Sequence, residues 1–312
     1  MGWVLLLSDI HANAYALEAV LSDARQKAEI EAVWFLGDLL GYGPSPLEVL
    51  QQVREEGVYQ PDVWILGNHD KALARVFRVG KMAPEPPAGT SPQAWASWLE
   101  HWKRLREDPE HRAWYQNFLQ NGQGPRIFHA HGWEVVMIHG ALIRNMGGGV
   151  ADAIETYAFP WVSEEAKRAY FLSPLKGQIE AERCVVLFGH THVPMCQVVQ
   201  KEGAARPGFV ELLHRYDVPV SLGGQGWVLI NPGSVGQPRD GDSRAAYALL
   251  NLEKGEIVFH RVSYPVKETA KALTRLGWYE LAQRLVEGSL ARSREEIGDY
   301  LSILEERKGA PV

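Results

Sequence analysis

Short apolar runs alternate with amphipathic patterns over the first 70 residues of the chain. The apolar runs occupy residues 4–7, 32–36 and 63–66, and each of them ends abruptly at a polar cluster. Between the runs, residues 15–27 carry apolar side chains at helical spacing, and a second helix is predicted after Pro44. Apolar runs of this length are typical of strands that are buried on both faces. The order strand, helix, strand, helix, strand predicts βαβ units and an α/β fold.

Residues 71–125 interrupt this alternation. Proline and glycine are frequent in residues 80–92, which predicts a loop, and a tryptophan-rich helix is expected to follow it. Trp95, Trp98 and Trp102 would share one face of that helix, and we interpret this face as buried. The alternative is an aromatic platform that stacks a nucleobase over a site. The whole segment predicts an inserted helical cap.

The strand pattern resumes after the cap and continues almost to the C-terminus. Two apolar runs within residues 126–138 predict a hairpin. The other predicted elements are strands at residues 184–188, 227–230, 247–252 and 257–262, and helices at residues 266–287 and 293–307. We therefore assign residues 1–312 to one domain, with the cap at 71–125 and C-terminal helices within 264–312.

The composition fits a folded protein and restricts its partners. Of the 312 residues, 46% are hydrophobic and 22% are charged, which is ordinary for a folded chain and excludes a disordered one. The net charge of −6 predicts no strong nucleic-acid binding. The N-terminus lacks the pattern of a signal peptide, and no apolar stretch has the length of a membrane span. We therefore expect a cytoplasmic protein without a membrane partner.

Polar side chains that can bind metals follow the predicted strands. Strand ends in an α/β sheet gather along one edge, which is where such folds place their sites. The residues concerned are Asp9, His11, Asp38, Asn68, His69, Asp70, His139, His190 and His192. Carboxylates, imidazoles and one amide form a mixed ligand set that suits Mn, Fe, Co, Ni or Zn better than Ca. The set is too large for one tetrahedral ion and predicts two divalent ions that share a carboxylate, provided that the chain turns after each strand.

Five short blocks of sequence carry these polar residues. They are Ser8-Asp9-Ile10-His11, Leu36-Gly37-Asp38, Leu66-Gly67-Asn68-His69-Asp70, Ile138-His139-Gly140 and Phe188-Gly189-His190-Thr191-His192. In this order the blocks resemble the signature of the calcineurin-like metallophosphoesterases. Gly41-Tyr42-Gly43-Pro44 and residues 231–239 are similar to a small bacterial and archaeal branch of that family. The resemblance covers residues 1–70 and 126–290, and it implies two facing mixed β-sheets flanked by helices.

The resemblance implies a role for each residue of the set. It implies one ion bound by Asp9, His11, Asp38 and His192, and a second bound by Asp38, Asn68, His139 and His190. His69 matches the family's catalytic histidine and Asp70 the carboxylate that orients it, although Asp70 also suits the start of a helix. One departure is Ala12, which stands where the family usually has glycine.

These roles imply hydrolysis of a phosphate ester by a hydroxide that bridges the two metals. Protonated His69 would then stabilise or protonate the leaving group. We favour a small phosphorylated substrate, either a phosphodiester or a nucleotide, and manganese as the first choice among the five metals. Arg239 is a candidate for binding a substrate phosphate, the alternative being a pair with Asp240 or Asp242.

Two other functions stay open on the sequence. One is a phosphomonoesterase or protein Ser/Thr phosphatase, although the arginine that follows the Gly-Asp block in protein phosphatases is absent after Asp38. The other is a protein-binding scaffold that keeps the fold without activity, against which the seven filled ligand positions argue. The sequence leaves any oligomeric partner undetermined.

Overall fold

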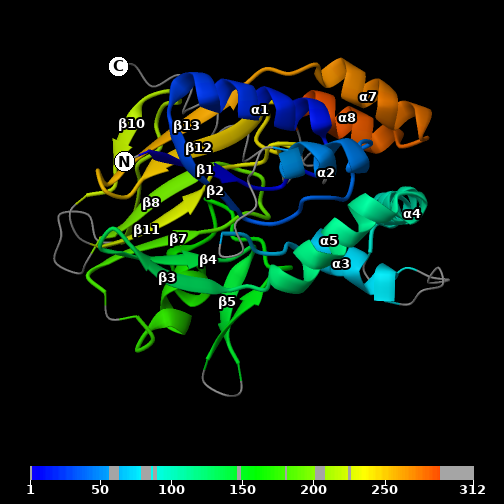
Figure 1. Ribbon diagram of the computed structural model, residues 1–312. Coiled ribbons are helices and arrows are strands. Elements are labelled where there is room, and N and C mark those ends of the chain that lie inside the picture. Colours follow the sequence, from blue (N-terminus) through cyan, green and yellow to red (C-terminus); the bar gives the residue numbers. More distant parts are fainter. Residues whose placement is uncertain are drawn as a thin grey trace.

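The computed structural model arranges the strands in two stacked β-sheets (Figure 1). It describes residues 2–55, 63–78, 86, 90–145, 149–179, 181–200, 208–223 and 226–288. The first sheet has the strand order β10 (Pro219–Ser221), β13 (Glu256–Val262), β12 (Ala245–Asn251), β1 (Trp3–Leu7) and β2 (Ile30–Phe35). The second has the order β3 (Arg126–Ala130), β4 (Trp133–Met137), β7 (Arg183–Leu187), β11 (Gly226–Asn231), β8 (Met195–Gln200) and β9 (Gly208–Glu211). A separate hairpin is formed by β5 (Ala141–Arg144) and β6 (Val150–Ala153).

Both sheets are mixed, because parallel pairs are extended by antiparallel hairpins. In the first sheet, β1 pairs in parallel with β2 and antiparallel with β12. In the second, β7 lies in parallel between β4 and β11, and β3 forms the predicted hairpin with β4. The prediction of a strand at residues 63–66 is wrong in its length, because the observed pairing there is shorter. Only one bridge forms there, between Phe35 and Trp64, because the chain turns at Gly67 and enters helix α3 (Asn68–Arg78).

The inward faces of the two sheets share an apolar layer. Its fully buried side chains include Leu6 and Phe259 from the first sheet and Val185 from the second. The outer face of the first sheet is covered by α1 (Ala14–Lys27), α2 (Pro46–Glu55), α7 (Val266–Arg275) and α8 (Tyr279–Glu287). Helical turns at Arg168–Leu172 and Ser173–Leu175, which follow α6 (Glu164–Lys167), pack on the outer face of the second sheet. This architecture confirms the predicted sandwich of two mixed sheets between helices.

The C-terminal part departs from the predicted helices. Residues 266–287 form two helices, because Gly277 adopts a φ of +79° between α7 and α8. This left-handed conformation is readily available to glycine and ends the first helix. The helix predicted at 293–307 lies outside the described residues, as does most of the loop predicted at 80–92.

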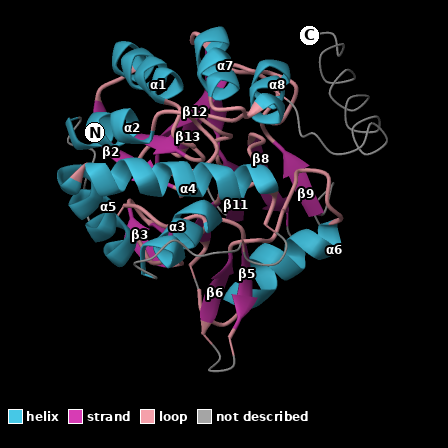
Figure 2. Cartoon of the chain, turned by 90° about the vertical axis from the view of Figure 1, so that its right-hand side faces the viewer, coloured by secondary structure: helices cyan, strands magenta, loops and turns pink. Residues whose placement is uncertain are grey.

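The inserted segment is helical, as predicted. Besides α3 it contains α4 (Pro92–Glu107) and α5 (Pro109–Asn121), and Figure 2 looks onto α4 in front of the sheets. Both helices begin with proline after a side-chain cap, Ser91 for α4 and Asp108 for α5. None of the described helices is long and apolar enough to cross a membrane.

The tryptophan stripe lies mainly inside the protein. Trp98 and Trp102 are buried and Trp95 is half-buried, which confirms the expectation of a buried helix face. The helices of the insertion share one apolar cluster with α1 and the first sheet. That residues 1–312 form a single domain stays a prediction.

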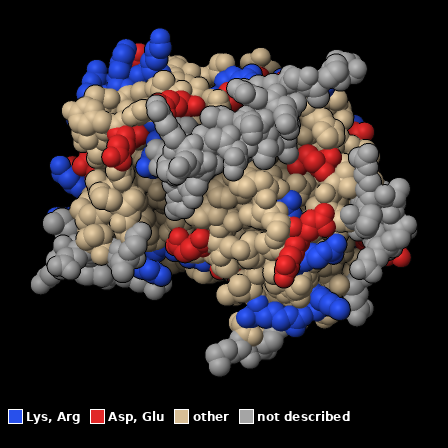
Figure 3. Space-filling model, turned by 180° about the vertical axis from the view of Figure 1, so that it is seen from behind, with Lys and Arg blue, Asp and Glu red and all other residues tan. Residues whose placement is uncertain are grey.

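Acidic and basic side chains are interspersed on the described surface shown in Figure 3. Neither sign gathers there in one broad patch. On that face, the described residues therefore create no large field of a single sign.

We expect Leu6→Ala to destabilise the protein by about 2–5 kcal/mol, because Leu6 is fully buried between the sheets. Val286→Ala is the control, since that side chain on α8 is 51% exposed. It should change the free energy of unfolding by less than about 0.5 kcal/mol. Urea denaturation followed by circular dichroism measures both values. Equal effects would contradict the position of Leu6 in the layer between the sheets.

Candidate active site

Most of the candidate ligands lie in loops that leave one edge of the two sheets. Asp9 and His11 follow β1, Asp38 follows β2, and His190 and His192 follow β7. All five have positive φ angles, between 48° and 64°. Such backbone is uncommon outside glycine, costs about 1–3 kcal/mol per residue, and accumulates at functional sites. These turns let side chains two residues apart meet at one point.

The side chains that can bind metals meet in adjoining buried clusters. Within each cluster the potential ligand atoms all lie within 4.8 Å of one another. The clusters are Asp9 with His11 and His192; Asp38 with His139 and His190; and an overlapping group of His11, Asp38 and His69.

Asp38 lies between the first two clusters. Its Oδ2 is 3.7 Å from His11 Nε2 and 3.4 Å from His139 Nε2. Asn68 completes the second cluster, because its Oδ1 is 3.3 Å from His139 Nε2 and 3.1 Å from His190 Nδ1. The structure thus brings all seven predicted ligand candidates together, with one carboxylate in the shared position.

Unpartnered polar atoms test whether these clusters suit cations. The Nε2 atoms of His11 and His192 face each other at 3.1 Å. Asp9 Oδ1 lies 3.2 Å from His192 Nε2 without the geometry of a hydrogen bond, and the buried His190 Nε2 has no partner among the described residues. Burying such atoms unpaired is costly, and coordination to a divalent ion removes that cost. The residues present therefore fit divalent metal ions.

Backbone carbonyls orient two of the imidazoles. His139 Nδ1 lies 2.7 Å from the Leu36 carbonyl oxygen, and His192 Nδ1 lies 2.6 Å from that of Gln237. Because a carbonyl oxygen only accepts, Nδ1 carries the proton in each hydrogen bond. When these rings are neutral, as metal ligands have to be, their Nε2 lone pairs are left to face the clusters.

Burial and neighbouring charges shift the pKa values of the cluster residues. Burial raises the pKa of Asp9 and Asp38, but the surrounding histidines outweigh it and hold both below their ordinary values. Burial lowers the pKa of His11 well below its ordinary value. It also lowers the pKa of His139, but the charge of Asp38 outweighs burial there and raises that pKa to about 10. The ionised carboxylates thus attract positive charge into the centre of the site.

Asp70 does not orient the imidazole of His69, contrary to the prediction. Neighbouring residues on a helix point in different directions, and Asp70, in the first turn of α3, points back toward the loop after β2. Its carboxylate accepts hydrogen bonds from the N–H groups of Gly67, Asp38 and Leu39 and from the Tyr115 hydroxyl. The alternative role at the helix start is therefore the one that the structure supports, because the Gly67 N–H is satisfied.

Several residues of the insertion that contact the site were missed. Trp98 Nε1 donates to His69 Nδ1 at 3.0 Å, and His101 Nδ1 accepts from the Gly41 N–H at 3.2 Å. The spacing of the tryptophans predicted that Trp98 is buried. No sequence pattern predicts that its indole N–H contacts His69, which lies 29 positions away. His101 carried no signal at all, because it follows no strand.

The alternative partners of Arg239 are occupied by other side chains. Asp240 pairs with Arg261, and Asp242 pairs with Arg244 at 2.7 Å. Both carboxylates that the sequence offered to Arg239 are thus engaged by other arginines.

Arg239 lies beside the clusters instead. Its Nη2 donates to Gln237 Oε1 at 3.0 Å, and the side chain is buried. After burial, the charge of Arg239 is the largest influence that lowers the pKa of His192. A buried cation whose charge acts on a cluster residue can also attract an anionic group.

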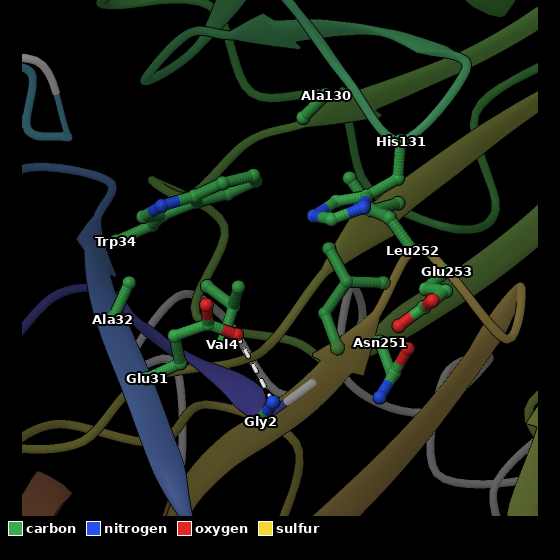
Figure 4. A pocket seen from close by; sticks show the side chains of 11 residues that line it. Gly2, Val4, Glu31, Ala32, Trp34, Ala130, His131, Asn251, Leu252 and Glu253 are labelled. Atoms are coloured by element: carbon green, nitrogen blue, oxygen red, sulfur yellow. Dashed lines mark hydrogen bonds between the residues drawn. The ribbon is translucent and has the colours of Figure 1, made fainter.

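A cavity of about 300 Å³ lies at the opposite edge of the sheets (Figure 4). The start of β1 and β2 and the end of β12 line it, with Trp34 and His131 projecting into it from opposite sides. None of the cluster residues lines this cavity, so it is separate from the site.

Comparison with known proteins identifies the family. The sequence profile of the calcineurin-like phosphoesterase superfamily domain matches residues 3–255. The chain belongs to this superfamily. The match confirms the resemblance carried by the five blocks, and the protein is a phosphate ester hydrolase.

This phosphoesterase is similar to proteins of several organisms. An uncharacterized protein of Methanocaldococcus jannaschii is 26% identical over 277 residues, 87% of this chain and 92% of that protein. The crystal structure of a metallophosphoesterase from Sphaerobacter thermophilus is 27% identical, with a TM-score of 0.65 over 92% of this chain and 99% of that one. A symmetrical bis(5'-nucleosyl)-tetraphosphatase of Erwinia tasmaniensis is 38% identical over 72 residues, which span only 23% of this chain and 26% of that protein.

The family explains why this phosphoesterase has clusters that suit divalent metals. Its one departure from the family pattern, Ala12, adopts a φ of +48°. The alanine thus takes a left-handed conformation that glycine reaches more easily, and the loop after β1 keeps its turn.

We expect Gly67→Ala to weaken Mn²⁺ binding by this phosphoesterase at least about 10-fold. A Cβ at Gly67 would lie 2.0 Å from Asp38 Oδ1, so the carboxylate has to move. Isothermal titration of the metal-free protein with Mn²⁺ measures the effect. Gly149→Ala is the control, because its nearest contact is the flexible Asn145 side chain at 3.3 Å. Unchanged Mn²⁺ affinity in a folded Gly67→Ala protein would contradict a role for Asp38 in metal binding.

Proposed function

We propose that this phosphoesterase hydrolyses a phosphodiester or nucleotide substrate at two divalent metal ions. The observation that carries the proposal is the position of Asp38 Oδ2, within 3.7 Å of imidazole nitrogens from both clusters. One carboxylate oxygen in that place suits two ions that share a ligand.

In this proposal, each ion has its own set of side chains. One ion is bound by Asp9, His11, Asp38 and His192, and the other by Asp38, Asn68, His139 and His190. Convergence of these side chains and their unpartnered atoms support the assignment. Mixed nitrogen and oxygen ligands suit Mn, Fe, Co, Ni or Zn, and manganese stays our first choice among them.

Bound divalent ions activate water and neutralise phosphoryl charge. The chain's own residues then have two tasks. Arg239 binds a phosphoryl oxygen of the substrate, which its buried guanidinium beside the clusters supports. His69 is the catalytic residue at the leaving group, and its position in the overlapping cluster with His11 and Asp38 supports that role. Asp70 contributes only indirectly, by fixing the backbone of Asp38.

Two observations bear on the choice of substrate. The short match to a protein named a symmetrical bis(5'-nucleosyl)-tetraphosphatase favours a nucleotide. Protein phosphatases have an arginine shortly after the Gly-Asp block. Its absence after Asp38 argues against a phosphoprotein as the substrate.

We expect Mn²⁺-dependent hydrolysis of an aryl phosphodiester faster than that of the matching monoester, and loss of both activities with chelator. Asp38→Asn should lower kcat/KM at least about 100-fold, because it removes the shared anionic ligand. Asp217→Asn is the control, since that carboxylate is 55% exposed and is hydrogen-bonded to Lys27 and His260, which belong to neither cluster. A faster monoester reaction would make the protein a phosphomonoesterase. Activity that survives chelator and Asp38→Asn would contradict the two-metal proposal.

We expect Arg239→Met to lower kcat/KM about 10- to 100-fold, mostly through a higher KM. The reason is the loss of a charged hydrogen bond to the substrate phosphate. Arg244→Met is the matched control, because Arg244 pairs with Asp242 at the surface and should leave the kinetics unchanged. Similar KM values for the wild type and a folded Arg239→Met protein would exclude Arg239 from substrate binding.

A further inference from the structure

The imidazole of His69 is held by a side chain of the insertion. Trp98 Nε1 on α4 donates to His69 Nδ1 at 3.0 Å, and both side chains are buried. The rings are 5.4 Å apart between centroids, at an angle of 71°. Asp70 makes its hydrogen bonds elsewhere, and Asp38 Oδ1 accepts from the backbone N–H of His69 at 2.9 Å. Among the described residues, no carboxylate therefore hydrogen-bonds the His69 ring.

This contact decides which ring nitrogen carries the proton. An indole N–H can only donate, so His69 Nδ1 accepts and cannot hold a proton while the hydrogen bond persists. The proton of the ring then lies on Nε2.

Further hydrogen bonds fix α4 against the loop beneath His69. Ser97 Oγ accepts from the Tyr42 N–H at 3.0 Å, and His101 Nδ1 accepts from the Gly41 N–H. A Cβ at Gly41 would lie 2.4 Å from His69 Nδ1, so a side chain at that position would collide with the ring. Because Gly41 has no side chain, the Nδ1 atom of His69 is accessible to Trp98. Ser97 and His101, which precede and follow Trp98 on α4, hold this helix against the loop.

We infer that Trp98 positions His69 as a neutral Nε2–H donor, which suits the site to leaving groups that depart as weakly basic oxyanions, such as the phosphate of a phosphoanhydride. This inference rests on the proposed function. It replaces the protonated His69 expected from the sequence. A neutral imidazole can hydrogen-bond a developing negative charge without giving up its proton.

The reaction balances without a proton from His69. The oxygen of water forms a bond to phosphorus, and the water releases one proton to solvent. The bond from phosphorus to the leaving oxygen breaks, and its electron pair stays on that oxygen. His69 Nε2–H hydrogen-bonds this oxygen and keeps its proton. A phosphate leaving group tolerates this, because its second pKa is about 6, whereas an alkoxide requires a proton.

The tautomer can be measured without activity. In metal-free protein labelled with ¹⁵N-histidine, long-range ¹H–¹⁵N spectra distinguish the Nε2–H tautomer from the Nδ1–H tautomer and from imidazolium. The His69 signals are identified by their loss in His69→Ala. We expect an unprotonated Nδ1 in the wild type and in Trp102→Phe, and a mixture of tautomers in Trp98→Phe. Trp102 is a matched control, because it is buried on the same helix under Arg106. A protonated Nδ1 in the wild type would overturn the inference.

Kinetics with Mn²⁺ test the consequence for substrates. The series is a nucleoside phosphodiester with nitrophenyl, phenyl or alkyl leaving groups, together with a dinucleoside tetraphosphate. We expect wild-type kcat/KM to be at least about 100-fold higher for the nitrophenyl ester and the tetraphosphate than for the alkyl ester. Trp98→Phe should lower kcat about 10-fold at unchanged KM, and Trp102→Phe should change neither. Rates that do not depend on the leaving group, or equal kcat in the two variants, would overturn the inference.

Different results would contradict the proposed function and the role of Trp98. A wild-type protein that hydrolyses none of these substrates with Mn²⁺ contradicts the proposed function and the substrate preference together. An active wild type with a protonated Nδ1, or with rates that do not depend on the leaving group, contradicts the inference alone.

Discussion

One buried carboxylate, that of Asp70, holds together the edge on which the site is built. Its four donors come from the turn before α3, from the loop after β2 and from Tyr115 on α5. Burial and then the charge of Asp38 raise the pKa of Asp70 to about 7, so the donors offset only part of the cost of an ion at this place. The hydrogen bonds that this carboxyl group accepts fix the backbone of Asp38, and with it the shared carboxylate between the clusters.

The sheets and the seven ligand candidates could be predicted because their signals are local. An apolar run that ends at Asp-x-His or His-x-His is visible within a few residues, and the sheet edge then gathers these ends. The strand predicted at residues 63–66 was too long, because an apolar run alone does not determine how many residues pair with a neighbouring strand. The chain turns at Gly67, and only Trp64 forms a bridge. The predicted contact between Asp70 and the His69 ring was wrong, because residues that are neighbours in sequence point in different directions on a helix.

The insertion was predictable as helices but not as a part of the site. Trp98, His101 and Tyr115 contact the site through hydrogen bonds to His69, Gly41 and Asp70. Such contacts join segments that lie 29 to 60 positions apart, and they leave no periodicity in the chain. The spacing of apolar residues predicts which face of a helix is buried. The hydrogen-bond partner of one indole N–H can be identified only in the folded structure.

Ser97, Trp98 and His101 sit within one and a half turns of α4, and all three bind the Gly41–Tyr42 loop or the histidine above it. A different segment in place of this insertion would remove the hydrogen-bond donor to His69 Nδ1 together with the helix. The ring would then need another partner to keep the same orientation and tautomer. The insertion is therefore linked to the chemistry of the site through one hydrogen bond and is more than a cover over the sheets.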